Sequence, residues 1–125
     1  MDNRTKGEIG ENYACSFLEK EGFVIIERNY RKKWGEIDII AQKDGITHFF
    51  EVKSLRVASL GSVDMVYRPE ENVHGLKVRN IRRMIETYLF DKGVTEQDFS
   101  FHVLCVFVEM GTGEVRVKWI KDVIL

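Results

Sequence analysis

The sequence lacks the marks of a membrane protein, a secreted protein or a disulfide-stabilised protein. No apolar run approaches the roughly 20 residues that a helix needs to cross a bilayer, and residues 1–6 are not followed by the apolar core of a signal peptide. The two cysteines, Cys15 and Cys105, lie in separate apolar segments without CxxC or metal-ligand spacing. We therefore expect two buried thiols in a cytoplasmic protein that has no membrane partner.

A surplus of positive charge is also missing. Lys and Arg number 19 and Asp and Glu number 20, so the formal net charge is −1. Any binding to nucleic acid must therefore come from local patches rather than from the protein as a whole. There are no repeats, linkers or low-complexity segments, and the 125 residues are 44% hydrophobic and 31% charged. These values predict one globular domain, residues 1–125, with a single core.

Hydrophobic periodicity predicts two helices and five strands. The helices are expected from Thr5 to about Lys20 and from about Arg68 to Asp91, and the strands over residues 23–30, 35–43, 46–53, 99–109 and 115–119. The strand at 99–109 lacks clean alternation, so we expect it to be central and covered on both faces. Its His102 is expected to be a core or edge histidine, because His48 and His74 are isolated. The order αβββαββ predicts a mixed α/β fold (α+β), with a central mixed five-stranded sheet flanked by helices.

The stretch 35–53 has the pattern of a hairpin. Asp44 and Gly45 suit the left-handed backbone of a two-residue type I′ turn. With these two residues as the loop, Lys43 falls opposite Ile46, and the register of every further pair follows from that one.

The same register brings four charged side chains together. Asp38 falls opposite Glu51 and Glu36 opposite Lys53, all on one face, because side chains alternate along a strand. Two opposed carboxylates destabilise a strand pair unless a cation lies between them, and Mg²⁺ prefers such oxygens. A bound metal lowers the pKa of its water and neutralises charge on a phosphate, and Lys53 could orient that water. On spacing alone, an exposed hairpin face with solvated acids is an equally good interpretation.

Two groups of cations accompany the hairpin: a basic loop before it and the polar face of the second predicted helix. They are Arg31, Lys32 and Lys33 in the loop, and Lys77, Arg79, Arg82 and Arg83 in the helix. Beside a site that cleaves phosphodiesters, these cations predict contacts with the backbone of a nucleic acid. Without such a site they are explained as well by solvation of the surface.

Four sequence boxes resemble the YraN-like family of small bacterial proteins. They are Gly10-Glu11 followed by Ala14 and Leu18, Arg28-Asn29-Tyr30, Gly35-Glu36-Ile37-Asp38-Ile39-Ile40-Ala41, and Phe50-Glu51-Val52-Lys53. That family is similar to the Holliday-junction-resolvase branch of the PD-(D/E)xK nuclease superfamily. The resemblance covers nearly the whole chain and implies a restriction-endonuclease-like core with metal-dependent phosphodiesterase activity. The chain departs from the family at His102, where an acid is expected, and at Ser54-Leu55, where Thr-Arg is common.

The resemblance also implies roles for particular residues. The implied catalytic residues are Asp38, Glu51, Lys53, Glu36 and Glu11, and the implied ligands of Mg²⁺ or Mn²⁺ are Asp38, Glu51, Glu11 and the backbone carbonyl of Val52. Glu11 would reach the metal directly or through water, and Glu36 would orient Lys53 or add a ligand.

The expected function is therefore a metal-dependent endonuclease that acts on branched or otherwise structured nucleic acid, with DNA favoured as the substrate and RNA left open. One alternative is a non-catalytic nucleic-acid-binding or scaffolding module that retains the nuclease fold, which the near-neutral charge would suit. Another is a purely structural protein with solvated acids. Resolvase-like relatives act as dimers, so a homodimer remains open, although no residues indicate its interface.

Overall fold

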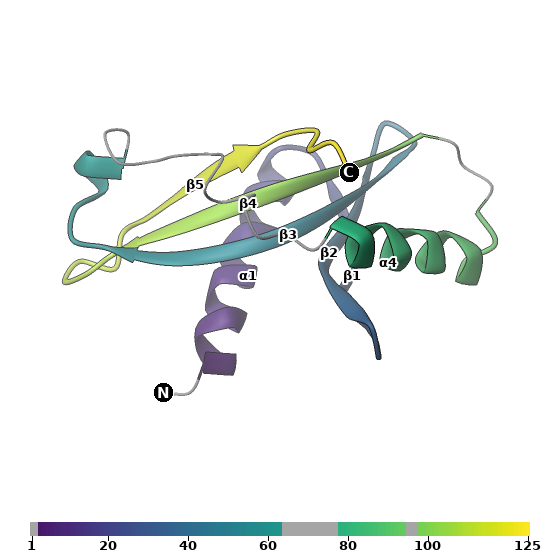
Figure 1. The fold of residues 1–125 in the computed structure, drawn as a ribbon. Helices are drawn as coiled ribbons and strands as arrows, with labels where there is room; N and C mark the ends of the chain where they lie inside the picture. The colour runs from purple at the N-terminus through teal and green to yellow at the C-terminus, as the bar shows by residue number, and fades with distance from the viewer. Residues whose placement is uncertain (1–2, 64–77, 95–97) are drawn as a thin grey trace.

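A computed structural model of the protein describes residues 3–63, 78–94 and 98–125 (Figure 1). Its elements are α1 (Asn3–Lys20), β1 (Val24–Lys32), β2 (Gly35–Lys43), β3 (Ile46–Val57), a short 3-10 turn (Leu60–Ser62), α4 (Val78–Asp91), β4 (Phe99–Glu109) and β5 (Val115–Ile120). Within these described residues, the predicted order of two helices and five strands is confirmed. The predicted entry of the second helix near Arg68 lies outside the described residues, as does Lys77.

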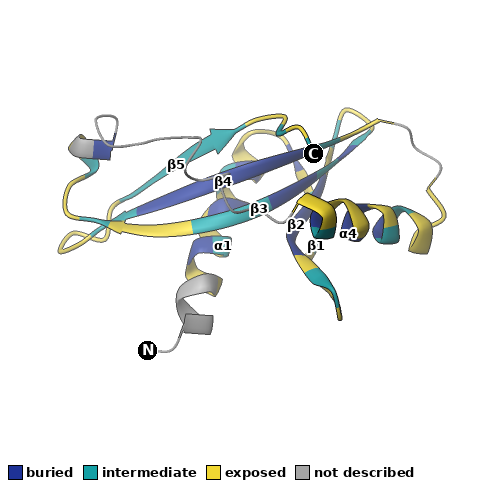
Figure 2. Cartoon of the chain, in the orientation of Figure 1, coloured by how far each residue is buried: buried dark blue, intermediate teal, exposed yellow. Residues whose placement is uncertain are grey.

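The five strands form one mixed sheet in the order β1-β2-β3-β4-β5. Every neighbouring pair is antiparallel except β3 and β4, which run parallel. Parallel strands require a crossover between them, and α4 lies on this connection. Residues 101–107 of β4 are all buried (Figure 2), so the expectation of a strand covered on both faces is confirmed.

The two helices cover opposite faces of the sheet. Neighbouring residues Phe49 and Phe50 show this, because they point to opposite sides of β3 and belong to two separate apolar clusters. The α4-side cluster contains Ile81, Met84, Ile85 and Tyr88 of α4 with Ile37, Phe49, Phe101 and Val103 of the sheet. The α1-side cluster contains Ala14, Cys15 and Leu18 of α1 with Ile39, Phe50, Leu104 and Val106. The result is a three-layer α/β domain.

The turn between β2 and β3 has the predicted conformation. Asp44 and Gly45 have φ values of 53° and 76°, in the left-handed region that a type I′ turn requires. Lys43 pairs with Ile46 as predicted, and the register continues without a shift to Ile39 opposite Phe50.

The basic loop expected before the hairpin is largely strand. Because β1 extends to Lys32, only Lys33 and Trp34 form the turn, and Arg31 and Lys32 point to opposite faces as neighbouring strand residues. β3 also continues four residues beyond Lys53, where a loop was expected. In both cases pairing with a neighbouring strand extends an element past the end that its own sequence indicates.

Both cysteines are buried and neither forms a disulfide bond within the described residues, as expected. Within the described part of the chain, no helix is both long enough and apolar enough to cross a membrane.

His102 is a buried histidine with hydrogen-bond partners, as expected, but the sequence did not indicate that the sheet places it in contact with His48. His48 lies on β3 and His102 on the neighbouring β4, with 2.9 Å between His48 Nδ1 and His102 Nε2. The backbone N–H of Asp122 donates to His102 Nδ1 at 3.0 Å. Since that nitrogen accepts, Nε2 of His102 carries the proton and donates to His48. This arrangement requires a neutral His102, and burial together with the nearby His48 lowers the pKa of His102 to about 4.

The histidine pair predicts a loss of stability in acid. The unfolded chain binds a proton on His102 below about pH 6.5, whereas the folded protein does so only near pH 4. The free energy of unfolding therefore decreases as the pH is lowered from about 6.5 to about 4. The shift corresponds to about 3 kcal/mol at its full extent. Denaturant unfolding of wild type and His102→Gln from pH 8 to pH 4 should show a weaker pH dependence for the variant. Parallel pH profiles would contradict this assignment.

Candidate functional site

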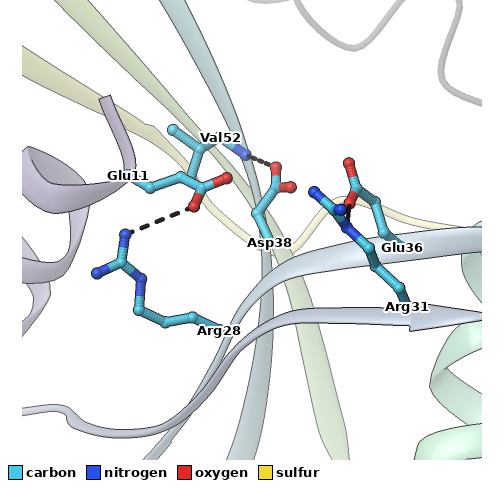
Figure 3. A network of polar contacts seen from close by, with 6 residues as sticks. All are labelled: Glu11, Arg28, Arg31, Glu36, Asp38 and Val52. Atoms are coloured by element: carbon cyan, nitrogen blue, oxygen red, sulfur yellow. Dashed lines mark hydrogen bonds and ion pairs between the residues drawn. The ribbon is translucent and has the colours of Figure 1, made fainter. Parts of the chain in front are cut away.

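The site begins where β2 and β3 separate. Their pairing ends at Ile39 opposite Phe50, so the predicted pairing of Asp38 with Glu51 is not formed. Instead, a carboxylate oxygen of Asp38 accepts a 2.7 Å hydrogen bond from the backbone N–H of Val52 (Figure 3). The carboxylate thus satisfies a donor on β3 that would otherwise lose its acceptor at the point where the strands diverge.

Alternation of side chains is interrupted at the same point. Ile37 packs in the α4-side cluster and Ile39 in the α1-side cluster, although residues two apart on a regular strand share a face. On the paired strand β1, Asn29 has a left-handed φ of 53° and lies between the partners of these two residues. Both strands therefore change face here, and Asp38 occupies the point of change.

Asp38 is a buried acid in a negative environment. Only 8% of the residue is exposed. Burial raises the pKa of Asp38 to about 7, the hydrogen bond from Val52 opposes the increase, and the negative charges of Glu51, Glu11 and Glu36 add to it. The carboxylate is therefore only partly ionised near neutral pH in the absence of a cation.

Glu51 and Lys53 are residues of β3, the strand next to the one that carries Asp38. They alternate with Phe50 and Val52, which pack toward α1, so both point to the α4 side of the sheet. Burial raises the pKa of Glu51, Lys53 opposes this increase, and Glu36 adds to it. Glu51 is thus close enough to Asp38 to raise its pKa, and Lys53 is close enough to Glu51 to lower that of Glu51.

Glu11 reaches the site from the other side of the sheet, on α1. Its carboxylate points toward Asp38 and lies 3.5 Å from an Nη of Arg28 on β1 (Figure 3). The helix can approach because Gly10 is buried against Ser54 of β3. A Cβ at Gly10 would lie 1.8 Å from Ser54 Oγ and 3.1 Å from Ser54 Cβ. The sequence prediction missed this contact, for which an isolated glycine within a helical segment is the only signal.

Glu36 has a different partner from the one expected. It accepts a 2.6 Å hydrogen bond from Arg31 Nε on β1, whereas the hairpin register placed it opposite Lys53. Glu11 and Glu36 are therefore each held by an arginine of β1, at the two sides of Asp38 (Figure 3).

The donor set suits a hard divalent cation. In residues 3–63, 78–94 and 98–125, no three His, Cys, Asp or Glu side chains are grouped closely enough to hold a metal ion. However, Mg²⁺ keeps several waters and needs only one or two protein carboxylates. Asp38 and Glu51 would supply these, with the backbone carbonyl of Val52. Burial is the main cause of the raised pKa values of both acids, with neighbouring carboxylates adding to it, and a bound cation would stabilise their ionised forms.

The cations expected to bind nucleic acid do not form one patch. Arg31 is paired with Glu36, and Lys32 lies 3.2 Å from Asp91. Three arginines lie on α4, on the sheet face toward which Glu51 and Lys53 point. Arg83 stacks over Trp34 with its guanidinium carbon 4.1 Å from the ring centroid. Lys33, Arg79 and Arg82 form no ion pair with any other residue that the structure describes.

Comparison with known proteins identifies the family. Residues 10–110 match the model of the uncharacterised protein family UPF0102. The chain belongs to this family, and the resemblance to YraN-like proteins is confirmed. The matched region includes α1 from Gly10 onward and the whole of the β2–β3 site.

Several relatives are similar over most of their length. A UPF0102 protein of Campylobacter lari is 43% identical over 101 residues, which are 81% of this chain and 82% of the relative. A UPF0102 protein of Dictyoglomus turgidum is 34% identical over 119 residues, 95% of this chain and 94% of the relative. Among solved structures, Pyrococcus furiosus SfsA in complex with Ca²⁺ aligns over 99% of this chain and 66% of its own, with 16% identity and a TM-score of 0.39. That similarity is too low to support an argument.

The buried carboxylate predicts that Asp38→Asn stabilises the protein at neutral and alkaline pH. The folded state holds the proton up to about pH 7, so the stability associated with protonated Asp38 is lost as pH rises through that value. Asparagine is neutral and its side-chain oxygen can still accept from Val52. With EDTA present, denaturant unfolding should show a gain of about 2–4 kcal/mol at pH 8 and almost none at pH 4.

The exposed Asp98 provides a matched control, because Asp98→Asn should change stability little at either pH. A loss of stability for Asp38→Asn at pH 8 would show that the ionised carboxylate contributes more through its hydrogen bond than burial removes.

The contact between α1 and β3 predicts that Gly10→Ala has opposite effects on stability in wild type and in a Ser54→Gly variant. Gly10→Ala should destabilise the protein by about 1–3 kcal/mol because the methyl group overlaps Ser54. In a Ser54→Gly background the overlap is removed, and the same change should stabilise by about 0.5–1 kcal/mol through helix propensity. A double-mutant cycle by urea unfolding measures both values. The same sign in both backgrounds would exclude a close contact at this crossing.

Proposed function

We propose that the protein is a metal-dependent endonuclease that hydrolyses phosphodiester bonds in DNA, with branched or otherwise structured DNA as its substrate. The observation that carries the proposal is the buried Asp38, held at the separation of β2 and β3 beside Glu51 and Lys53. Burying acids together destabilises a fold unless a cation or a proton compensates them, and sites that perform chemistry are where such arrangements concentrate.

Each residue of the site would have a separate role in hydrolysis. Asp38 and Glu51 would hold Mg²⁺ or Mn²⁺ together with the Val52 carbonyl. The bound ion would supply a nucleophile at neutral pH and neutralise charge on the phosphate. Lys53 would orient the attacking water and stabilise the negative charge that develops on the phosphate. Glu11 would contribute from α1 directly or through water, and Glu36, which is held by Arg31, would add a ligand.

The location of the site agrees with a nucleic-acid substrate. Glu51 and Lys53 point to the sheet face that carries α4, whose exposed side bears Arg79, Arg82 and Arg83. A strand that reaches the site on this face would meet these cations, which suit backbone phosphates. Cutting two strands of a junction symmetrically would need two copies of the protein. The resemblance of the Asp38 and Glu51 boxes to resolvase-like nucleases also supports the proposal.

A second candidate is a nucleic-acid-binding or scaffolding module without catalysis. The ion pairs Glu11–Arg28 and Glu36–Arg31 favour it, because they satisfy two of the implied catalytic acids without a metal. This candidate predicts DNA binding that survives Asp38→Asn and Glu51→Gln and has a steep salt dependence.

A titration with Mn²⁺ combined with a cleavage assay separates the two candidates. Calorimetry should detect Mn²⁺ binding to wild type and to Lys53→Ala but not to Asp38→Asn. Cleavage of four-way, flapped and linear DNA should be abolished in Asp38→Asn and slowed by about 10²- to 10³-fold in Lys53→Ala.

Lys20→Ala serves as the control, because Lys20 is exposed at the end of α1 and its loss should leave both measurements unchanged. Binding of Mn²⁺ without scission of any substrate would favour a missing partner or substrate. An absence of Mn²⁺ binding in wild type would overturn the catalytic proposal in favour of the scaffold.

A further inference from the structure

Helix α4 presents one outward stripe to solvent. Its buried residues Ile81, Met84, Ile85 and Tyr88 occupy one side, and an α-helix turns by 3.6 residues, so the residues opposite them form a line along the exposed side. That line consists of Arg79, Arg82, Arg83, Glu86 and Phe90, all of them exposed. The first four, with Val78, line a hollow of about 560 Å³. The stripe thus joins a cationic hollow to an aromatic ring.

Phe90 has no role in the core. It is 86% exposed at the C-terminal end of the stripe, and it belongs to neither apolar cluster. Single exposed apolar residues are common on protein surfaces. Phe90 differs in its position, because it follows Arg83 by two helical turns on the same side of the helix, at a rise of about 10 Å along the axis.

We infer that the α4 stripe is a binding track for single-stranded DNA, in which Arg79, Arg82 and Arg83 contact backbone phosphates and Phe90 stacks against an unpaired base. The inference deepens the proposed function and rests on its choice of DNA as substrate. Among structured substrates, it selects those that contain a single-stranded segment, such as flapped DNA.

Two features of the stripe favour this occupant. The cations require a polyanion, and a phenyl ring in water requires an apolar surface, and a single strand offers both at once because every base has a π-face. The length of the stripe also agrees: the rise from Arg79 to Phe90 is about 16 Å, enough to contact several successive nucleotides of a strand. Glu86 lies between Arg83 and Phe90, where its charge would turn a phosphate away and leave the base as the group that meets the ring.

The cations of β1 do not extend this track, because they form ion pairs with acidic side chains. Arg31 is occupied by Glu36 and Lys32 by Asp91, whereas Arg83 is oriented by its stacking over Trp34. Of the cations considered for nucleic acid, those on α4 are the ones aligned with an exposed aromatic ring.

The test compares bases with backbone. Binding of a fluorescent oligothymidine, of an abasic oligonucleotide of equal length and of a fully paired duplex would be measured in EDTA, so that cleavage plays no part. Phe90→Ala should weaken oligothymidine binding by about 5- to 100-fold and leave the abasic strand and the duplex unchanged. Phe90→Tyr should retain wild-type affinity because it keeps the ring.

Salt dependence separates the ring from the cations. Arg82→Ala should weaken binding of all three ligands. It should also reduce the slope of log affinity against log salt by the amount expected for about one phosphate contact, whereas Phe90→Ala should leave that slope unchanged. Met110→Ala is the matched control, because Met110 is an exposed apolar residue in the β4–β5 turn, far from α4 (Figure 1).

Equal affinity of Phe90→Ala and wild type for oligothymidine would overturn the inference, as would an equal loss for the abasic strand. The second result would show that the ring contributes to binding without stacking against a base. Binding is measured without metal, so its result does not depend on cleavage. A protein that cleaves DNA but shows no effect of Phe90→Ala would contradict this inference alone. A protein that cleaves nothing but shows the expected effect of Phe90→Ala would contradict the proposed function alone.

Discussion

The hydrogen bond from the Val52 N–H to the Asp38 carboxylate is the contact on which the candidate site depends. It forms where β2 and β3 stop pairing, and it gives β3 an acceptor that β2 no longer offers. β3 can then continue alone beside β4, while β2 continues with β1. A carboxylate at this position holds the strands apart and is buried by the same geometry. The separation and the raised pKa of Asp38 therefore have one physical origin.

The surrounding elements add acids from both sides of the sheet. Glu51 comes from the α4 side by strand alternation, with the cation Lys53 beside it, and Glu11 comes from the α1 side through the close approach at Gly10. Two arginines of β1 balance the outer acids, so the excess of negative charge falls on the centre. A group of acids arranged in this way destabilises the fold when nothing compensates its charge. Membership of the family shows that relatives have similar sequences, but it does not show what the proteins do.

The two faces of the domain differ in what they offer to a partner. On the α1 side, the helix covers the sheet closely and leaves Glu11 as its contribution to the site. On the α4 side, a helix with a fully apolar inner face exposes a line of arginines and one phenyl ring. A substrate that reached Glu51 and Lys53 would pass this second face, so the chemistry and the recognition surface lie on the same layer of the fold.

The sequence by itself determined the order αβββαββ, the type I′ turn and the register of the hairpin up to Ile39, because these depend on local periodicity and on the left-handed backbone at Asp44 and Gly45. It also identified Asp38, Glu51 and Lys53 as neighbours. Only the tertiary structure decided that the hairpin opens after Ile39, that Glu36 pairs with Arg31, and that His48 meets His102 across a parallel pair of strands. Each of these depends on contacts between residues distant in sequence or on a competition between partners, and neither is encoded in the spacing of a single segment.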